Sequence, residues 1–255
     1  MKPLSSRQQA ILNRVIDMHI ETAQPVGSRT ITELYSELYR SSYSPATVRN
    51  EMGILEGLGY LTHPHTSAGR IPTDRGYRYY VNHSVQEEKL PEDMVRRLNQ
   101  DLMVRPSEEE GLAEKACRVM AGFSNEVSIV LVSRKGSRQV KFFLQGSSSL
   151  LEKPEFCDLE KIRLLLKAFE EKGLLAGWLQ EKTQAPGVSV SIGRENEVKA
   201  LQDCAIVSTR YEASGELSGT VAVIGPCRMR YSRAMPLVSQ ISRLLGRALE
   251  NGTDY

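Results

Sequence analysis

Three side chains suited to hydrogen bonding with nucleic-acid bases lie close together in the sequence: Thr47, Arg49 and Asn50. Arginine can pair with a guanine edge and asparagine with an adenine edge through two hydrogen bonds each, and threonine can contact a thymine methyl or a phosphate. Just before them, Ser44 is suited to cap a helix and Pro45 to occupy its first position. We therefore expect a helix that presents base-reading side chains.

Helical spacing predicts which face of this segment points outward. Val48, Met52 and Leu55 fall on one apolar face. The opposite face is made of small or polar residues, namely Ala46, Asn50, Gly53 and Gly57. An ordinary solvated helix usually carries lysine and glutamate there. From the helix alone, a merely solvated face is the alternative interpretation. Small residues permit close approach of another molecule, and free N–H groups at a helix start attract phosphate.

A polar tail follows, in which "YLTHP" and "GRIPT" flank "HTSAG" and predict a small β-hairpin. Five of its side chains are too polar to pack in the core between two strands: His63, His65, Thr66, Ser67 and Arg70. We interpret the hairpin as a wing beside a nucleic-acid groove, with Arg70 at a phosphate or a minor-groove edge. Further phosphate contacts are expected from Arg75, Tyr77 and Arg78.

Zinc is the rival ligand for His63 and His65. Alternation places both side chains on one face of a strand, but Pro64 lies between them. No nearby cysteine or carboxylate has the spacing of a zinc ligand, so we expect no metal site.

The elements that must position these residues follow from apolar periodicity. A first helix starts at Ser5 or Ser6, and a second begins at Ser28, where Ser28, Arg29 and the cap residue Ser44 are further candidates for phosphate contacts. Segment 74–85 predicts another helix, although Gly76 weakens that assignment. Three helices, a hairpin and a connecting helix are the order of a winged helix-turn-helix.

The rest of the chain predicts an α+β domain. Segment 87–110 is rich in charge and contains two prolines, which indicates a linker with some helix. Beyond it, five strands are expected, mostly with hairpin-length connections, between helices that come before and after. The expected strands are 126–133, 138–146, 187–193, 204–212 and 217–225, and the last helix starts near Tyr231. We place domains at 1–86 (winged helix), 87–110 (helical linker) and 111–255.

Composition sets further limits. The chain has 255 residues, and its formal net charge of +2 means that the placement of basic residues, not their total, decides whether it binds a polyanion.

Four widely spaced cysteines without a CxxC pair favour free thiols in a reducing compartment. The first apolar run carries charges at Arg14 and Asp17, unlike a signal peptide. We expect a cytoplasmic protein.

Catalytic motifs are missing from the sequence. It contains no phosphate-binding loop, no GxSxG and no HExxH, and all four histidines lie in the first 83 residues. We therefore expect neither an enzyme nor a bound cofactor. "GPCRMRYSR" at 225–233 could hold an anion through its arginines, but a turn with solvated arginines is the simpler interpretation.

Several long strings resemble one family. "QPVGSRT", "SPATVRNEM", "LEGLGYLTHPHTSAGRIPTDRGYRYYV", "SIGREN" and "VAVIGPCRMRYSRAM" are similar to the heat-inducible transcription repressor HrcA of bacteria. The resemblance implies a homodimeric repressor that binds an inverted repeat, the CIRCE operator, upstream of chaperone operons and depends on the GroEL chaperonin. It also implies a recognition helix at 44–57, a wing at 61–73 and a GAF-like second domain.

The chain departs from that family in length. Family members usually exceed 300 residues and interrupt the GAF-like domain with an inserted dimerising domain. Here "EVSIVLVS" is followed almost at once by "RQVKFFLQG", so the insertion is expected to be missing between about 133 and 138. Dimer contacts would then fall to the helices of 87–122 and the last helix.

Two other functions are compatible with the residues alone. The second domain could sense a small metabolite and gate the winged helix, in which case it would carry an apolar pocket with a few convergent polar groups. Alternatively, the basic wing could bind an acidic protein, as in a chaperone adaptor that does not bind DNA.

Overall fold

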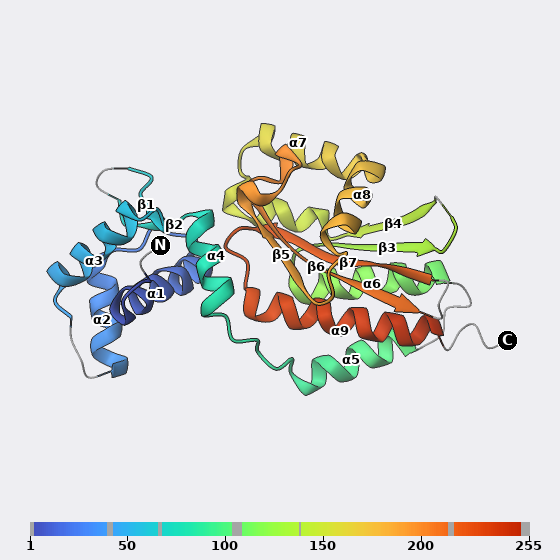
Figure 1. Ribbon diagram of the computed structural model, residues 1–255, viewed down its shortest axis with the longest axis horizontal. Coiled ribbons are helices and arrows are strands. Elements are labelled where there is room, and N and C mark those ends of the chain that lie inside the picture. The colour runs from blue at the N-terminus through green and yellow to red at the C-terminus, as the bar shows by residue number, and fades with distance from the viewer. Residues whose placement is uncertain are drawn as a thin grey trace. The chain divides into compact units, whose positions relative to one another are not determined.

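A computed structural model describes residues 3–39, 43–65, 68–103, 109–137, 139–213 and 217–250. The chain forms two compact units, Met1–Val85 and Gln86–Tyr255 (Figure 1). Across the described ranges, no helix combines the length and the apolar character needed to cross a membrane.

The first unit is helical, with one small hairpin. Its elements in chain order are α1 (Ser6–Thr22), α2 (Ser28–Tyr39), α3 (Pro45–Gly57), β1 (Leu61–Thr62), β2 (Ile71–Pro72) and α4 (Asp74–His83). Helix α1 packs against the other three helices and β2. The expected winged helix-turn-helix is confirmed.

Local sequence explains where these helices begin. Ser5 caps α1: its hydroxyl accepts the Gln8 N–H, and the Gln8 side chain accepts the Ser5 N–H. The apolar stripe of α1 is fully buried, as its spacing predicts: Ile11, Leu12, Val15, Ile16 and Ile20. Thr73 caps α4 by accepting the Gly76 N–H.

The chain before α2 adds a third extended segment to the hairpin. Val26 and Arg70 form an antiparallel bridge, with both N–H···O distances at 2.9 Å. Gly69 makes this approach possible, because a Cβ there would lie 2.5 Å from the Val26 carbonyl carbon. The wing is therefore joined to the "QPVG" segment as well as to its own strands.

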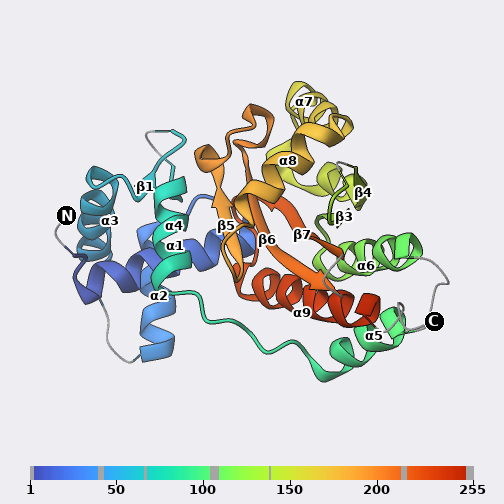
Figure 2. The ribbon, with the colours of Figure 1, turned by 45° about the vertical axis from the view of Figure 1, so that its right-hand side comes forward.

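The second unit is built on a five-stranded antiparallel sheet. Its elements in chain order are α5 (Glu92–Met103), α6 (Glu109–Ser124), β3 (Val127–Arg134), β4 (Val140–Gln145), α7 (Leu159–Glu170), α8 (Lys172–Lys182), β5 (Ser189–Ile192), β6 (Cys204–Ala213), β7 (Leu217–Pro226) and α9 (Tyr231–Glu250). The strand order is β4-β3-β7-β6-β5 (Figure 2). All five expected strands and the last helix are confirmed; α8 was not predicted as a helix.

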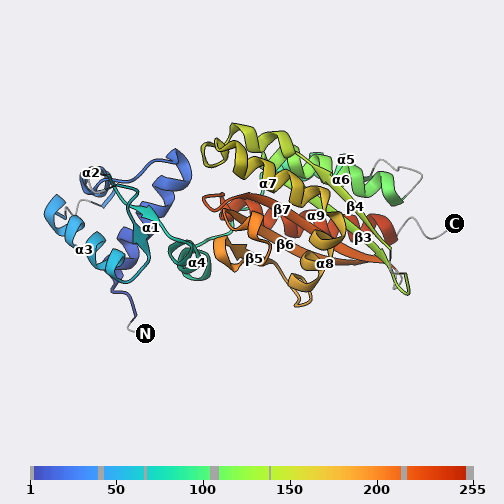
Figure 3. The ribbon, with the colours of Figure 1, turned by 90° about the horizontal axis from the view of Figure 1, so that it is seen from above.

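Helices cover both faces of this sheet. Helices α6 and α9 pack on one face, whereas α7 and α8 lie on the other (Figure 1), and the view from above looks onto the side of α7 and α8 (Figure 3). Because both faces are covered, β3 and β7 are buried along nearly their whole length. The core under α7 and α8 includes Ile129, Leu131 and Ile206 from the strands and Phe169 and Trp178 from the helices. This α+β arrangement is GAF-like.

The segment expected to be a linker, 87–110, contains α5, which packs against α6 and α9 and buries Leu98 and Leu102. Strands β3 and β4 pair as direct neighbours, from Ser128 with Gln145 to Ser133 with Val140. Strand β3 ends at Arg134 and β4 begins at Val140, at the place where the sequence predicts the family's insertion to be missing.

Candidate nucleic-acid interface

Helix α3 is held on the unit by one face and exposed on the other. Val48, Met52 and Leu55 are buried, as predicted, at 0%, 3% and 0% exposure. The Arg49 and Asn50 side chains are both exposed on the opposite side. The anchoring is therefore apolar, and the groups able to recognise a base are left to solvent.

A shallow hollow lies on this exposed face. Its volume is about 480 Å³, and its lining is formed by Ala46, Arg49, Asn50, Gly53 and Ile54. A Cβ built on Gly53 would have no atom within 4 Å, so the space over Gly53 is unfilled. Sequence reasoning named all of these positions on the outward side except Ile54.

The start of α3 is ordered by its own residues. The Ser44 hydroxyl accepts the Thr47 N–H at 3.1 Å and lies 2.9 Å from the Thr47 hydroxyl. Thr47 is half-buried, so only part of its side chain is accessible. Ser44 is exposed and acts as the predicted N-cap.

Glu56 ties the wing to α3. One carboxylate oxygen lies 2.5 Å from His63 Nδ1, and the other lies 2.7 Å from Arg70 Nε. The Arg70 side chain is only 24% exposed. The sequence interpretation of Arg70 as a DNA contact requires a side chain bare to solvent. The structure instead pairs Arg70 with Glu56 of α3, so most of its side chain is covered.

The rest of the wing is partly described. His65 is exposed, whereas Thr66 and Ser67 lie outside the described residues. Sequence reasoning missed Glu56, because helical spacing places it beside the apolar face and no spacing rule links it to a later loop. Its position in the last turn of α3, close to a loop carrying His63 and Arg70, is the signal that could have found it.

The three remaining wing-side candidates lie on α4 and differ in exposure. Arg75 is exposed, with its guanidinium 4.7 Å from the centre of the Tyr60 ring. Arg78 is half-buried, 3.5 Å from Asn82 Oδ1. Tyr77 is only 2% exposed, and its hydroxyl lies 2.6 Å from His19 Nδ1. Its assignment to a nucleic-acid contact is wrong, because the ring packs in the core between α4 and α1.

The start of α2 offers two candidates that differ in exposure. Arg29 is exposed, whereas Ser28 is half-buried and its carbonyl accepts the Thr32 hydroxyl at 2.9 Å. Arg29 is therefore the more accessible of the pair.

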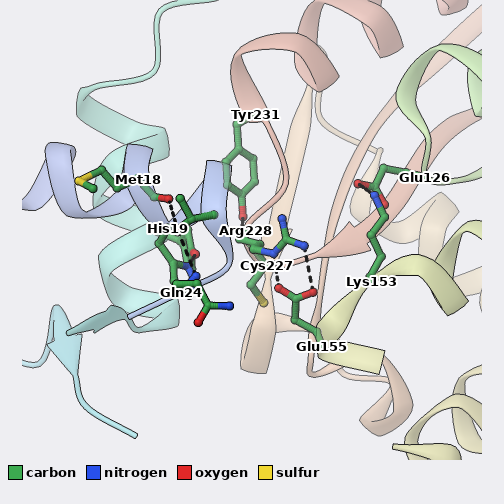
Figure 4. A network of polar contacts seen from close by, with 11 residues as sticks. Met18, His19, Gln24, Glu126, Lys153, Glu155, Cys227, Arg228 and Tyr231 are labelled. Atoms are coloured by element: carbon green, nitrogen blue, oxygen red, sulfur yellow. Dashed lines mark hydrogen bonds and ion pairs between the residues drawn. The ribbon is translucent and has the colours of Figure 1, made fainter. Parts of the chain in front are cut away.

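A separate polar cluster lies in the second unit at the start of β3 (Figure 4). Glu126 Oε1 lies 3.0 Å from Lys153 Nζ, and Arg228 is paired with Glu155. Burial raises the pKa of Glu126 to about 7, although Lys153 and Arg228 oppose that shift. Arg233 pairs with Glu88 at 2.8 Å. Two arginines of the suggested anion site therefore already contact carboxylates.

Metal binding finds no geometric support in the described ranges. They contain no group of three or more histidine, cysteine or carboxylate side chains placed to hold an ion. His63 instead contacts a single carboxylate, that of Glu56.

Comparison with known proteins covers almost the whole chain. The heat-inducible transcription repressor HrcA of Shouchella clausii is 31% identical and aligns with 96% of this chain and 98% of its own length. The protein of the same name from Desulforamulus reducens is 29% identical, with 97% of each chain covered. These alignments span 341 and 342 positions, so a long stretch of each relative has no counterpart among the 255 residues here.

A solved structure described as a hypothetical protein at 2.2 Å resolution has the same fold. It matches with a TM-score of 0.77 and 21% sequence identity, and the match covers 98% of this chain and all of that one. The family model described as the HrcA protein C terminal domain matches residues 77–235. From these similarities and from the two units described above, the chain belongs to the HrcA family.

Proposed function

We propose that this protein represses transcription of heat-shock operons by binding, as a homodimer, an inverted-repeat operator of the CIRCE type. Membership of the HrcA family supports the repressor role. One geometric observation carries the DNA-binding part: Arg49 and Asn50 are exposed together on a helix whose other face is anchored in the core.

The exposed side chains divide into two roles. Arg49 and Asn50, with the accessible part of Thr47, read base edges in the major groove. Phosphates are contacted by side chains around this helix, and we assign that role to Ser28, Arg29, Ser44, His65, Arg75 and Arg78. Ala46 allows close approach of the DNA.

Arg70 and His63 act mainly through Glu56. Their pairing with its carboxylate sets the position of the wing relative to α3. The wing then lies beside the groove that α3 enters. Glu56 lies close to the Nε of Arg70, and the guanidinium has further N–H donors on its two Nη atoms. One of these donors can contact a phosphate.

The dimer follows from the symmetry of the operator. An inverted repeat presents two equivalent half-sites, which a twofold pair of recognition helices would contact in successive major grooves. The direct β3–β4 hairpin and the long unmatched stretch of the relatives support the absence of an inserted domain here. We therefore assign the dimer contacts to the helices of 87–122 and to α9.

Regulation by heat requires no ligand in this proposal. If folding is marginal, a modest rise in temperature depletes the active dimer, and a GroEL-type chaperonin restores it. Free chaperonin would then report spare folding capacity in the cytoplasm, and repression would follow it.

A mobility-shift titration tests the DNA-binding proposal. The wild-type protein is titrated against an inverted-repeat duplex, a single half-site and a scrambled duplex, each at two salt concentrations. We expect the inverted repeat to bind at least 10³-fold more tightly than the scrambled duplex. Equal affinity for all three duplexes would refute sequence-specific repression, and a preference for the single half-site would refute the dimer.

A further inference from the structure

The recognition face of α3 contains one large apolar side chain that no assigned role uses. Ile54 is 42% exposed, although the helix buries its other aliphatic side chains Val48 and Leu55 completely. It lies one turn beyond Asn50 and lines the same hollow as Arg49 and Asn50. A single exposed isoleucine is common on protein surfaces. Ile54 is a candidate for DNA contact because it lies beside the two base-reading side chains.

The chemistry of the major groove suggests what Ile54 contacts. The C5 methyl group of thymine is the apolar group that base pairs present there, and aliphatic side chains recognise it by contact. The hollow is open next to Ile54, because a Cβ on Gly53 would meet no atom within 4 Å. A base edge held by Asn50 could therefore have a neighbouring base against Ile54.

We propose that Ile54 determines specificity for a thymine in each operator half-site by packing against its C5 methyl group. This inference rests on the proposed function, because it assumes that α3 enters the major groove. It adds an apolar contact to a recognition face otherwise assigned to polar groups. The thymine would lie beside the base pair that Asn50 reads.

Replacing thymine by uracil tests this contact, since uracil lacks only the methyl group. The probe is an inverted-repeat duplex that wild-type protein selects from a randomised pool. Each thymine is replaced in turn, in both half-sites together. Wild-type affinity should fall at one position by roughly three- to fivefold per half-site, the effect expected of one buried methyl group. Ile54→Ala should bind the thymine and uracil duplexes equally.

Two matched variants identify the side chain responsible. Leu58→Ala removes an aliphatic group of similar exposure, 40%, from a residue that does not line the hollow. It should keep the wild-type preference for thymine. Thr47→Ser removes a partly accessible methyl group that could itself contact a thymine. If Ile54 makes the contact proposed here, the preference for thymine at that position should survive this change. Equal melting temperatures for all variants would confirm that each is folded.

Each alternative result overturns the inference. It fails if no thymine of the selected duplex responds to uracil, if Ile54→Ala still prefers thymine, or if Thr47→Ser or Leu58→Ala loses the preference. These results leave the repressor proposal intact, because wild-type protein still binds the inverted repeat. Wild-type protein that selects no inverted repeat would instead overturn both.

Discussion

Arg49 and Asn50 are exposed because their neighbours in the sequence are buried. Val48 lies between Thr47 and Arg49, and with Met52 and Leu55 it fixes the rotation of α3 about its axis. A single-residue shift in that apolar pattern would turn the polar pair toward the core. The accessibility of the two side chains is therefore a consequence of packing on the other side of the helix.

Replacing Asn50 tests base reading at the residue scale. Asn50→Ala should weaken binding to the preferred operator by about 1–3 kcal/mol and relax specificity at one position of each half-site, because a bidentate contact with adenine is lost. The measurement is a mobility-shift titration against all four bases at each position. Glu181→Ala, at an exposed site on α8 that has neither a DNA-binding nor a dimer role here, serves as the control. Equal weakening on operator and random DNA would contradict a base-reading role.

Glu56 offers a second test at this scale. Glu56→Ala should release His63 and Arg70 and raise amide hydrogen-exchange rates in the wing by roughly fivefold, if the partly buried pairs contribute about 1 kcal/mol. Exchange in α1 should not change. Glu51→Ala on the same helix is the matched control, because Glu51 pairs with Arg7 instead. Unchanged exchange in the wing would show that Glu56 does not order it.

Close backbone approach shapes the elements around the wing. A Cβ at Gly76 would lie 2.3 Å from the Tyr60 carbonyl oxygen, so α4 can pack here only with glycine. The same residue weakened the sequence-based assignment of this helix. Its poor helix propensity is the cost of bringing α4 against the end of the hairpin.

Adding a methyl group at two glycines should have opposite effects. Gly76→Ala should destabilise the first unit by about 1–3 kcal/mol through overpacking. Gly122→Ala, in α6 with no atom within 4 Å, should stabilise the second unit by about 0.5–1 kcal/mol through helix propensity. Trp178, the only tryptophan, reports unfolding of the second unit, and hydrogen exchange in α1 reports the first. Wild-type exchange in Gly76→Ala would be evidence against the tight contact.

The buried cluster at the start of β3 predicts a pH dependence of the second unit. The folded pKa of Glu126, about 7, exceeds its ordinary value of 4.5. Folding therefore favours the protonated carboxyl, and stability should fall as pH rises from 4.5 to 7, by on the order of 3 kcal/mol at most. Urea unfolding at pH 5 and pH 8, followed by Trp178, measures this loss.

Glu126→Gln should remove most of that pH dependence, because glutamine does not titrate. Glu152→Gln, an exposed carboxyl nearby, should retain it. If Lys153 holds Glu126 ionised at all pH values, the wild-type protein and Glu126→Gln will show the same difference between pH 5 and pH 8. That result would rule out the raised pKa.

The whole molecule joins a winged helix-turn-helix unit to a GAF-like unit without the long stretch that its relatives carry. At the β3–β4 turn, where the sequence predicts the family's insertion to be missing, the two strands pair directly. An insertion at that turn would extend from the edge of the sheet and leave the core unchanged.

Recovery from heat tests the regulatory proposal at the scale of the whole molecule. Protein that is heat-denatured and cooled should regain operator binding severalfold better with a GroEL-type chaperonin and ATP than without, because the chaperonin refolds a marginally stable chain. Chaperonin without ATP is the control. Equal recovery with and without active chaperonin would count against this dependence, while leaving repression itself untouched.

The sequence by itself determined most of the elements, α8 excepted, and most of the recognition face. Apolar spacing predicted α1, α3 and α9 and the buried Val48, Met52 and Leu55, since a local periodicity of 3.6 residues needs no knowledge of distant contacts. Turn residues and apolar runs predicted the five strands.

Only the tertiary structure decided which residues meet. It placed Tyr77 in the core, paired Arg70 with Glu56 and set the strand order β4-β3-β7-β6-β5. The physical reason is that each outcome depends on the burial of one element by another distant in sequence, and on charges that become neighbours only after folding. Exposure of a polar side chain can be predicted from its own helix, but its partner cannot.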